Sequence, residues 1–169
     1  MDSIKVTIQY GPEDLQNAYA LHFKKVYPLR SRLVLILGAI LVLLGIFLAV
    51  LQSLSGIITW TSWAFVLYGI LVIAYYYWRF SRMGTSAFKK LVNFHFPFTF
   101  TINPEGVSTV GKNVSSNNSW EYYQSAIVTD SMIILYPNTL HLVLLPKKYF
   151  SEEEFTQMTV WVKENVRCK

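Results

Sequence analysis

Cysteine and histidine are scarce in this chain, and their scarcity excludes several kinds of chemistry. The 169 residues include one cysteine, Cys168, and three histidines that lie far apart, His22, His95 and His141. One thiol cannot form an intramolecular disulfide, and neither residue type occurs at metal-ligand spacing. The HExxH, GxSxG, Walker and GxGxxG signatures are absent as well. We therefore expect no metal, no cofactor and no enzyme activity.

Charge is missing from two long apolar stretches in the first half of the chain. Residues 33–51 are nineteen consecutive apolar or glycine positions, and residues 57–78 form a second stretch. A helix of the first stretch would run roughly 28 Å, close to the thickness of a bilayer's hydrocarbon core. The short link 52–56 (QSLSG) allows only a helical hairpin across the membrane. Because the spans lack acidic, basic and histidine side chains, they predict neither a proton relay nor a path for a charged substrate.

Basic residues gather beside the predicted spans, and the chain has a net charge of +5. The link between the spans carries no charge. The basic residues before and after the hairpin are Lys24, Lys25, Arg30, Arg32, Arg79, Arg82, Lys89 and Lys90. The positive-inside rule then places both termini in the cytoplasm and the link outside. This pattern predicts a multi-pass protein of the inner (plasma) membrane with lipids as partners, and no binding of nucleic acid.

Small and aromatic residues indicate how the hairpin packs. Gly38, Gly45 and Ala49 lie near one stripe of the first span, and Gly69 and Ala74 are the candidates on the second. Small residues let helices approach closely in lipid, so we expect these stripes to form the hairpin interface. Oligomerisation through the same faces is the alternative. Aromatic residues within 60–63 and 75–78 are expected to form belts at the two membrane surfaces.

The first 32 residues predict a strand followed by a helix. Apolar and polar side chains alternate over residues 4–10, which is typical of a strand with one buried face. A lone strand is unstable, so we expect residues 1–10 to join the sheet of the C-terminal part. Residues 12–32 then predict an amphipathic helix. We interpret it as a juxtamembrane helix that lies on the cytoplasmic surface or continues into the first span.

After the second span, residues 79–95 combine basic and apolar side chains. The spacing over residues 82–95 predicts a helix that lies on anionic headgroups. The residues expected to contact the membrane surface are Arg79, Arg82, Phe88, Lys89, Lys90 and Leu91.

Residues 96–169 predict a small cytoplasmic α+β domain. Short strands are expected within 96–110, 120–128, 132–136 and 140–145, with a polar loop at 111–119 and a hairpin turn at 137–139. Ser151 and the three glutamates that follow it form a capping box that starts a helix with one apolar face. Antiparallel strands that end in a single helix are typical of an α+β unit.

With its parts in this order, the chain resembles the YcxB-like membrane proteins of bacteria. The resemblance covers almost the whole length. It rests on FTFTINPEGVST, on SWEYYQSAIVTDSMIILY, which opens at Trp120, and on LVLLPKKYFSEEEF near the C-terminus. It implies a two-helix transmembrane hairpin that carries a domain similar to bacterial pleckstrin-homology-like domains. It implies no biochemical activity.

Two features of the last domain leave alternatives open. Lys147, Lys148 and Tyr149 form either a turn with solvated lysines or a basic patch that contacts anionic headgroups or a protein partner. Trp120 is expected to be a structural anchor of the core, with a place in a binding groove as the alternative.

We therefore expect a non-enzymatic bacterial inner-membrane protein whose cytoplasmic domain binds an unknown protein partner or the membrane surface. Its expected setting is the cell envelope, for example in stress response or in protection against a membrane-active toxin. The alternative is a subunit of an oligomeric transporter or channel, since two helices alone cannot enclose a pore.

Overall fold

A computed structural model describes residues 3–56, 60–138 and 141–168, without the side chains of residues 28, 30 and 31. The chain divides into two compact units. Residues 26–83 form the first, which we name the hairpin unit. Residues 1–25 and 84–169 form the second, which we name the sheet unit. The sheet unit is thus assembled from both ends of the chain.

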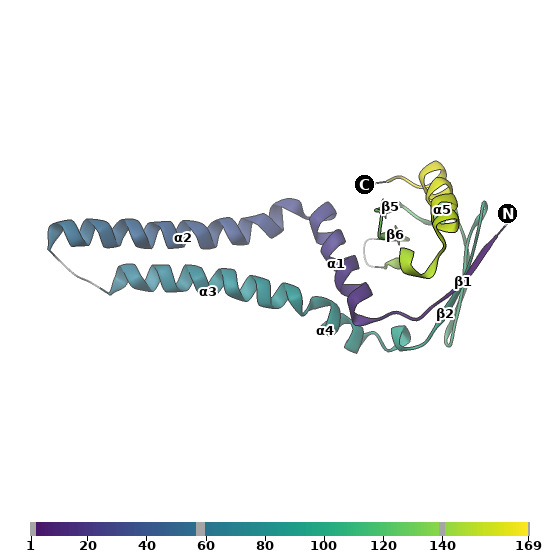
Figure 1. Cartoon of the computed structure of the whole chain (residues 1–169), viewed down its shortest axis with the longest axis horizontal. Helices are drawn as coiled ribbons and strands as arrows, with labels where there is room; N and C mark the ends of the chain where they lie inside the picture. Colours follow the sequence, from purple (N-terminus) through teal and green to yellow (C-terminus); the bar gives the residue numbers. More distant parts are fainter. Residues whose placement is uncertain (1–2, 57–59, 139–140, 169) are drawn as a thin grey trace. The chain divides into compact units, whose positions relative to one another are not determined.

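The hairpin unit consists of two long helices, α2 (Pro28–Ser55) and α3 (Thr61–Ser81), packed along each other (Figure 1). Both are long and apolar enough to span a membrane. Glycines let them approach closely, since a Cβ on Gly69 would lie 2.7 Å from the carbonyl oxygen of Gly38. Ala74, predicted on this stripe, is exposed instead.

The link between the helices differs from its predicted bounds. Residues 52–55 are the last turn of α2, which Gly56 ends in the left-handed conformation with φ of 70°. A helix that continues keeps its backbone groups hydrogen-bonded, which an apolar environment requires. The expected start of the second span, residues 57–59, lies outside the described residues. The prediction also missed a polar contact, in which the buried Ser62 donates from Oγ to Gln52 Oε1 at 3.0 Å.

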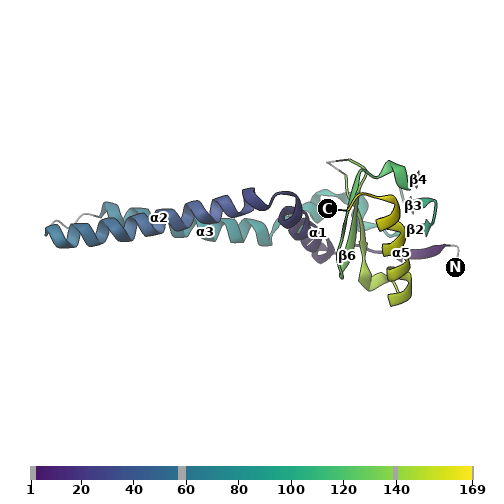
Figure 2. The ribbon, with the colours of Figure 1, turned by 90° about the horizontal axis from the view of Figure 1, so that it is seen from above.

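Two antiparallel sheets form most of the sheet unit. The four-stranded sheet has the order β1 (Ile4–Ile8), β2 (Phe98–Asn103), β3 (Gly106–Gly111) and β4 (Val114–Ser119). The three-stranded sheet has the order β5 (Ser125–Val128), β6 (Met132–Tyr136) and β7 (Val143–Pro146). The helix α5 (Glu152–Asn165) lies between the two sheets in Figure 1, and Figure 2 shows the same order. This is an α+β layout.

The N-terminal strand completes the four-stranded sheet. β1 pairs antiparallel with β2, with Ile4 opposite Ile102 and Ile8 opposite Phe98. Ile4 and Ile8 are buried while Lys5 is exposed, so the alternation in the sequence becomes one buried face. A strand that precedes the hairpin unit is therefore paired with one that follows it.

The polar segment 111–119, expected to be a loop, contains the strand β4. Its residues pair with β3, for example Ser115 with Val110 and Asn117 with Ser108. Most of its side chains are exposed. An edge strand of this kind is held by backbone hydrogen bonds to its neighbour and needs no apolar face. The hairpin turn expected at 137–139 reaches residue 139, which lies outside the described residues.

Both predicted juxtamembrane helices are shorter than expected. The first, α1 (Pro12–Val26), ends before Tyr27, because the following proline restricts the residue that precedes it. The second, α4 (Met83–Lys90), is separated by Leu91 from the short 3-10 helix η1 (Val92–His95). The predicted helix over 82–95 is therefore two pieces.

The core of the sheet unit is formed by both sheets and α5. Its fully buried side chains include Ile8, Ile102, Val107, Ile127, Ile133, Leu135, Leu145, Met158 and Val162. The capping box predicted for α5 is confirmed, since Ser151 Oγ accepts from the Glu154 N–H at 3.2 Å and the Ser151 N–H donates to the Glu154 carboxylate at 2.9 Å.

Candidate functional site

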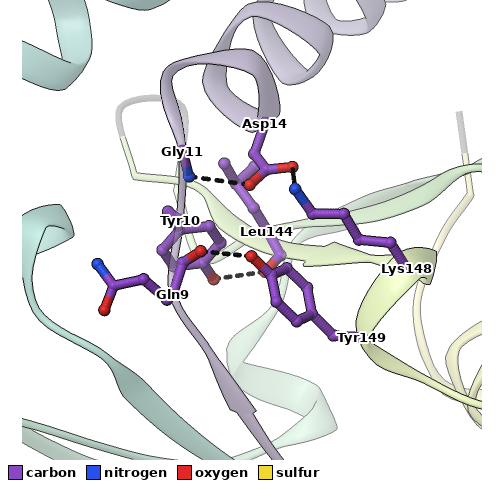
Figure 3. Close-up of polar contacts among 7 residues, drawn as sticks. All are labelled: Gln9, Tyr10, Gly11, Asp14, Leu144, Lys148 and Tyr149. Atoms are coloured by element: carbon purple, nitrogen blue, oxygen red, sulfur yellow. Dashed lines mark hydrogen bonds and ion pairs between the residues drawn. The ribbon is translucent and has the colours of Figure 1, made fainter.

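Polar contacts join the two ends of the chain within the sheet unit (Figure 3). We name them the polar cluster, which consists of Gln9, Tyr10, Gly11, Asp14, Leu144, Lys148 and Tyr149. The Tyr10 hydroxyl donates to the carbonyl oxygen of Leu144 at 2.5 Å, and the Tyr149 hydroxyl donates to the carbonyl oxygen of Gln9. The end of β1 is thereby fastened to β7 and to the short helix η3 (Lys147–Tyr149).

Asp14 is the charged centre of the polar cluster. It is buried in the first turn of α1, where its carboxylate accepts a hydrogen bond from the Gly11 N–H at 2.9 Å. A negative charge is favourable at this position because helix N-termini are electropositive. The Lys148 ammonium lies 2.7 Å from the other carboxylate oxygen. The hydrogen bond to Asp14 raises the pKa of Lys148, so this lysine stays charged in the neutral range.

Tyr10 is a neutral hydrogen-bond donor in this cluster. Burial raises the pKa of its hydroxyl, and the nearby Asp14 and Tyr149 raise it further. Its ring packs against Phe94 and Phe98, with centroid distances of 4.9 and 5.9 Å. These polar atoms are satisfied by one another, so the cluster is suited to holding the chain ends together and not to activating a nucleophile.

An open pocket of about 570 Å³ adjoins the polar cluster. It is lined by Asp14, Asn17, Asp130, Ser131, Met132, Pro146, Lys147, Lys148, Phe150 and Glu152. Four of its charges form two ion pairs, since Lys147 Nζ lies 2.8 Å from the Glu152 carboxylate and Lys148 pairs with Asp14. With three carboxylates and two ammonium groups, the lining offers hydrogen bonds of both kinds and no excess of positive charge. Such a pocket fits a polar side chain or a small polar ligand better than a free anion.

The structure therefore changes the interpretation of the Lys147–Tyr149 turn. The alternatives were a turn with solvated lysines or a basic patch, and in the structure each lysine is paired with a carboxylate. The Tyr149 hydroxyl is occupied by the Gln9 backbone, and the Lys148 ammonium lies 5.0 Å from the Tyr149 ring centroid. The sequence did not predict Asp14 as a member of this cluster, because it marks Asp14 only as an acid in a first helical turn.

Trp120 is buried at the start of the short 3-10 helix η2 (Trp120–Tyr122). Its Nε1–H lies 3.0 Å from the carbonyl oxygen of Pro104 and 3.2 Å from that of Asn103. The ring thereby fastens the β2–β3 turn to the segment that leads to β5. The strand predicted over 120–128 begins only at Ser125, because η2 takes up the first residues.

The predicted membrane-surface residues fall in both units. Arg79 and Arg82 are exposed in the hairpin unit, and the Arg82 guanidinium carbon lies 4.9 Å from the Trp78 ring centroid. Lys89, Lys90 and Leu91 are exposed in the sheet unit, whereas Phe88 is half-buried.

Segment 84–96, which we name the platform, is fixed within the sheet unit. Phe88 packs on the His95 ring at 4.6 Å, and His95 Nε2 is 3.0 Å from the Phe88 carbonyl oxygen. Gln9 Nε2 donates to the His95 carbonyl oxygen at 3.1 Å, and the Gly84 N–H donates to Gln16 Oε1 at 2.7 Å. These contacts make the platform part of the folded domain, not a free amphipathic helix.

A second tyrosine contact joins α1 to the three-stranded sheet. His22 Nδ1 lies 2.8 Å from the Tyr136 hydroxyl, and burial raises the pKa of Tyr136 to about 12. The sequence does not indicate this partner for His22. Among the described residues, no group of three or more His, Cys, Asp or Glu is placed to hold a metal ion.

Comparisons with protein families, with curated proteins and with solved structures find no match to this chain.

Proposed function

We propose that the chain is a non-enzymatic bacterial membrane protein in which the hairpin unit is the anchor and the sheet unit is a cytoplasmic binding domain. The YcxB-like family is the proposed relationship, on the resemblance given above. The order of four strands, three strands and a closing helix supports a pleckstrin-homology-like fold for the sheet unit.

The observation that carries the proposal is the apolar surface of the hairpin unit. Only 11% of each span's most apolar window is buried, and large side chains are open on both helices, such as Leu43 (66%) and Leu67 (60%). An apolar surface of this extent in water would drive aggregation, whereas a bilayer covers it without cost. The flanking basic residues favour the orientation with both chain ends in the cytoplasm.

Binding is favoured over catalysis by the chemistry of the sheet unit. The polar cluster pairs its charges and hydroxyl groups internally, and the adjoining pocket is open and of mixed polarity. A partner's polar side chain is the kind of group that this lining accommodates. The alternative function, that of a transporter subunit, requires an oligomer, and native mass spectrometry of the chain in nanodiscs tests it.

The single native cysteine gives a direct test of the anchor. Cys168 is exposed, so a membrane-impermeant maleimide should label it in lysed cells and not in intact spheroplasts. The matched control is Ser55→Cys in a Cys168→Ser background, because Ser55 is exposed at the end of α2 and should be labelled in intact spheroplasts. Alkaline carbonate should leave the chain in the pellet. Labelling of Cys168 in intact spheroplasts contradicts the proposal, and so does release of the chain from the membrane by carbonate.

A further inference from the structure

Apolar side chains are open at one end of the four-stranded sheet, where β3 turns into β4. Val110 is 54% exposed at the end of β3, and Val114 is 36% exposed at the start of β4. Val114 lies opposite Gly111, the neighbour of Val110, so the two valines project from opposite faces of the ribbon. The tip of this turn, Lys112 and Asn113, is exposed between them.

The turn is fixed beside the platform. The Lys112 ammonium lies 4.0 Å from the centroid of the Phe96 ring. A Cβ on Gly111 would lie 2.8 Å from two atoms of the Phe98 ring, so the backbone of the turn packs directly on that side chain. The platform carries two more open apolar residues, Leu91 at 40% and Val92 at 61%. Two segments that meet at Phe96 and Lys112 therefore each present open apolar side chains.

The charges of this region have a single sign. No aspartate or glutamate occurs between Asp14 and Glu105, and none occurs between Glu105 and Glu121. The platform and the β3–β4 turn contribute Lys89, Lys90 and Lys112, all exposed. The acidic side chains of the four-stranded sheet are confined to its opposite end, where Glu105 lies in the β2–β3 turn. Positive charge with open apolar side chains is complementary to the interface of an anionic bilayer.

Chain connectivity brings the platform to a membrane surface if the hairpin unit is the anchor. The last residue of α3 is Ser81, and α4 begins two residues later at Met83. The eight residues of α4 span about 12 Å, and Leu91 follows α4 directly in the chain.

We propose that the β3–β4 turn is a second membrane-contact element, which dips Val110 and Val114 into the interface of an anionic phospholipid bilayer while Lys112 faces the headgroups. The inference rests on the proposed anchoring of the hairpin unit and extends it. Lipid contact then involves the sheet itself and sets the domain's orientation on the membrane. Each lysine at such a surface raises the ratio of membrane-bound to free turn by about fivefold at low salt, and by less as salt rises.

The test is fluorescence quenching of the full chain in nanodiscs that contain phosphatidylglycerol. In a Cys168→Ser background, an environment-sensitive label is attached at Asn113→Cys in the turn. The matched control is Ser119→Cys, at the far end of β4 and about 20 Å away along the strand. A third label at Leu43→Cys, exposed in the middle of α2, reports insertion of the hairpin unit.

Shallow nitroxide lipids should quench the label at Asn113→Cys and leave the label at Ser119→Cys unquenched, while deep nitroxide lipids quench the label at Leu43→Cys. Lys112→Gln should lower the ratio of quenched to unquenched label by about fivefold. Val110→Ser with Val114→Ser should reduce the quenching as well, and so should phosphatidylcholine nanodiscs.

Equal quenching at Asn113→Cys and Ser119→Cys, or none at either, overturns the inference while quenching at Leu43→Cys still supports the anchor. A label at Asn113→Cys that is shielded from water without lipid quenching points to a protein contact and also overturns it. Absence of quenching at Leu43→Cys overturns the proposed anchor and this inference together.

Discussion

The packing of α1 on α4 makes a sharp prediction for Gly84→Ala. The Gly84 N–H donates to Gln16 Oε1, and a Cβ on Gly84 would lie 2.4 Å from the Gln16 backbone nitrogen and 2.5 Å from its Cα. Non-bonded carbon atoms normally approach to about 3.5–4.0 Å. An alanine at this position must therefore push the two helices apart by about 1 Å.

The expected cost follows from three opposing effects. Overpacking of this kind costs about 1–3 kcal/mol, and losing the Gln16 hydrogen bond adds about 1 kcal/mol. Alanine recovers at most about 1 kcal/mol through its higher helix propensity. The net loss should therefore be about 1–3 kcal/mol, and amide hydrogen exchange in α1 and α4 should accelerate roughly 5- to 160-fold.

Hydrogen exchange of the full chain in nanodiscs, read by mass spectrometry, measures this effect. Ser86→Ala is the control, because Ser86 is exposed on the same helix and should leave exchange unchanged. Shortening Gln16 to alanine should not rescue Gly84→Ala, since the nearest atoms belong to the Gln16 backbone. Wild-type exchange in Gly84→Ala would refute the reasoning, because the two helices would then not be in contact.

Local patterns predicted the parts of the fold that depend on local physics. The long apolar runs became α2 and α3, since a helix satisfies the backbone hydrogen bonds of a continuous apolar stretch within the stretch itself. The alternation of Ile4, Lys5 and Ile8 became a strand with one buried face. The Ser151 capping box was visible because both of its hydrogen bonds lie within one helical turn.

Long-range contacts could not be predicted in this way. Asp14 and Lys148 have the same local environment in the sequence as any acid in a first turn and any lysine in a loop. The contact of Gly84 with Gln16 depends on how two helices cross, which no periodicity encodes. The strand β4 was missed because an exposed edge strand needs only backbone pairing with its neighbour, and hydropathy carries no record of that pairing.

Three further predictions test the two units. Gly69→Leu should weaken the hairpin unit towards SDS-induced unfolding by about 1–3 kcal/mol, because any side chain at Gly69 meets the Gly38 carbonyl oxygen. The control is Ala74→Leu, which should be neutral because Ala74 is exposed. Lys148→Met should destabilise the sheet unit towards urea by about 2 kcal/mol, because this change leaves the buried Asp14 carboxylate without its cation. Asp14→Asn should cost only about 1 kcal/mol, because the half-exposed Lys148 ammonium still reaches water. Equal losses in the two variants would contradict this reasoning. Burial raises the pKa of Tyr136 from 10.0 to about 12, so the folded chain holds this proton more tightly than the unfolded chain does. The phenol's contribution to the free energy of unfolding is therefore intact below pH 10 and is lost as pH rises towards 12. The loss is at most about 2–3 kcal/mol. Absorbance titration at 295 nm should show one fewer late-titrating tyrosine in Tyr136→Phe, and loss of a tyrosine that titrates near pH 10 instead would show that the hydroxyl is not buried.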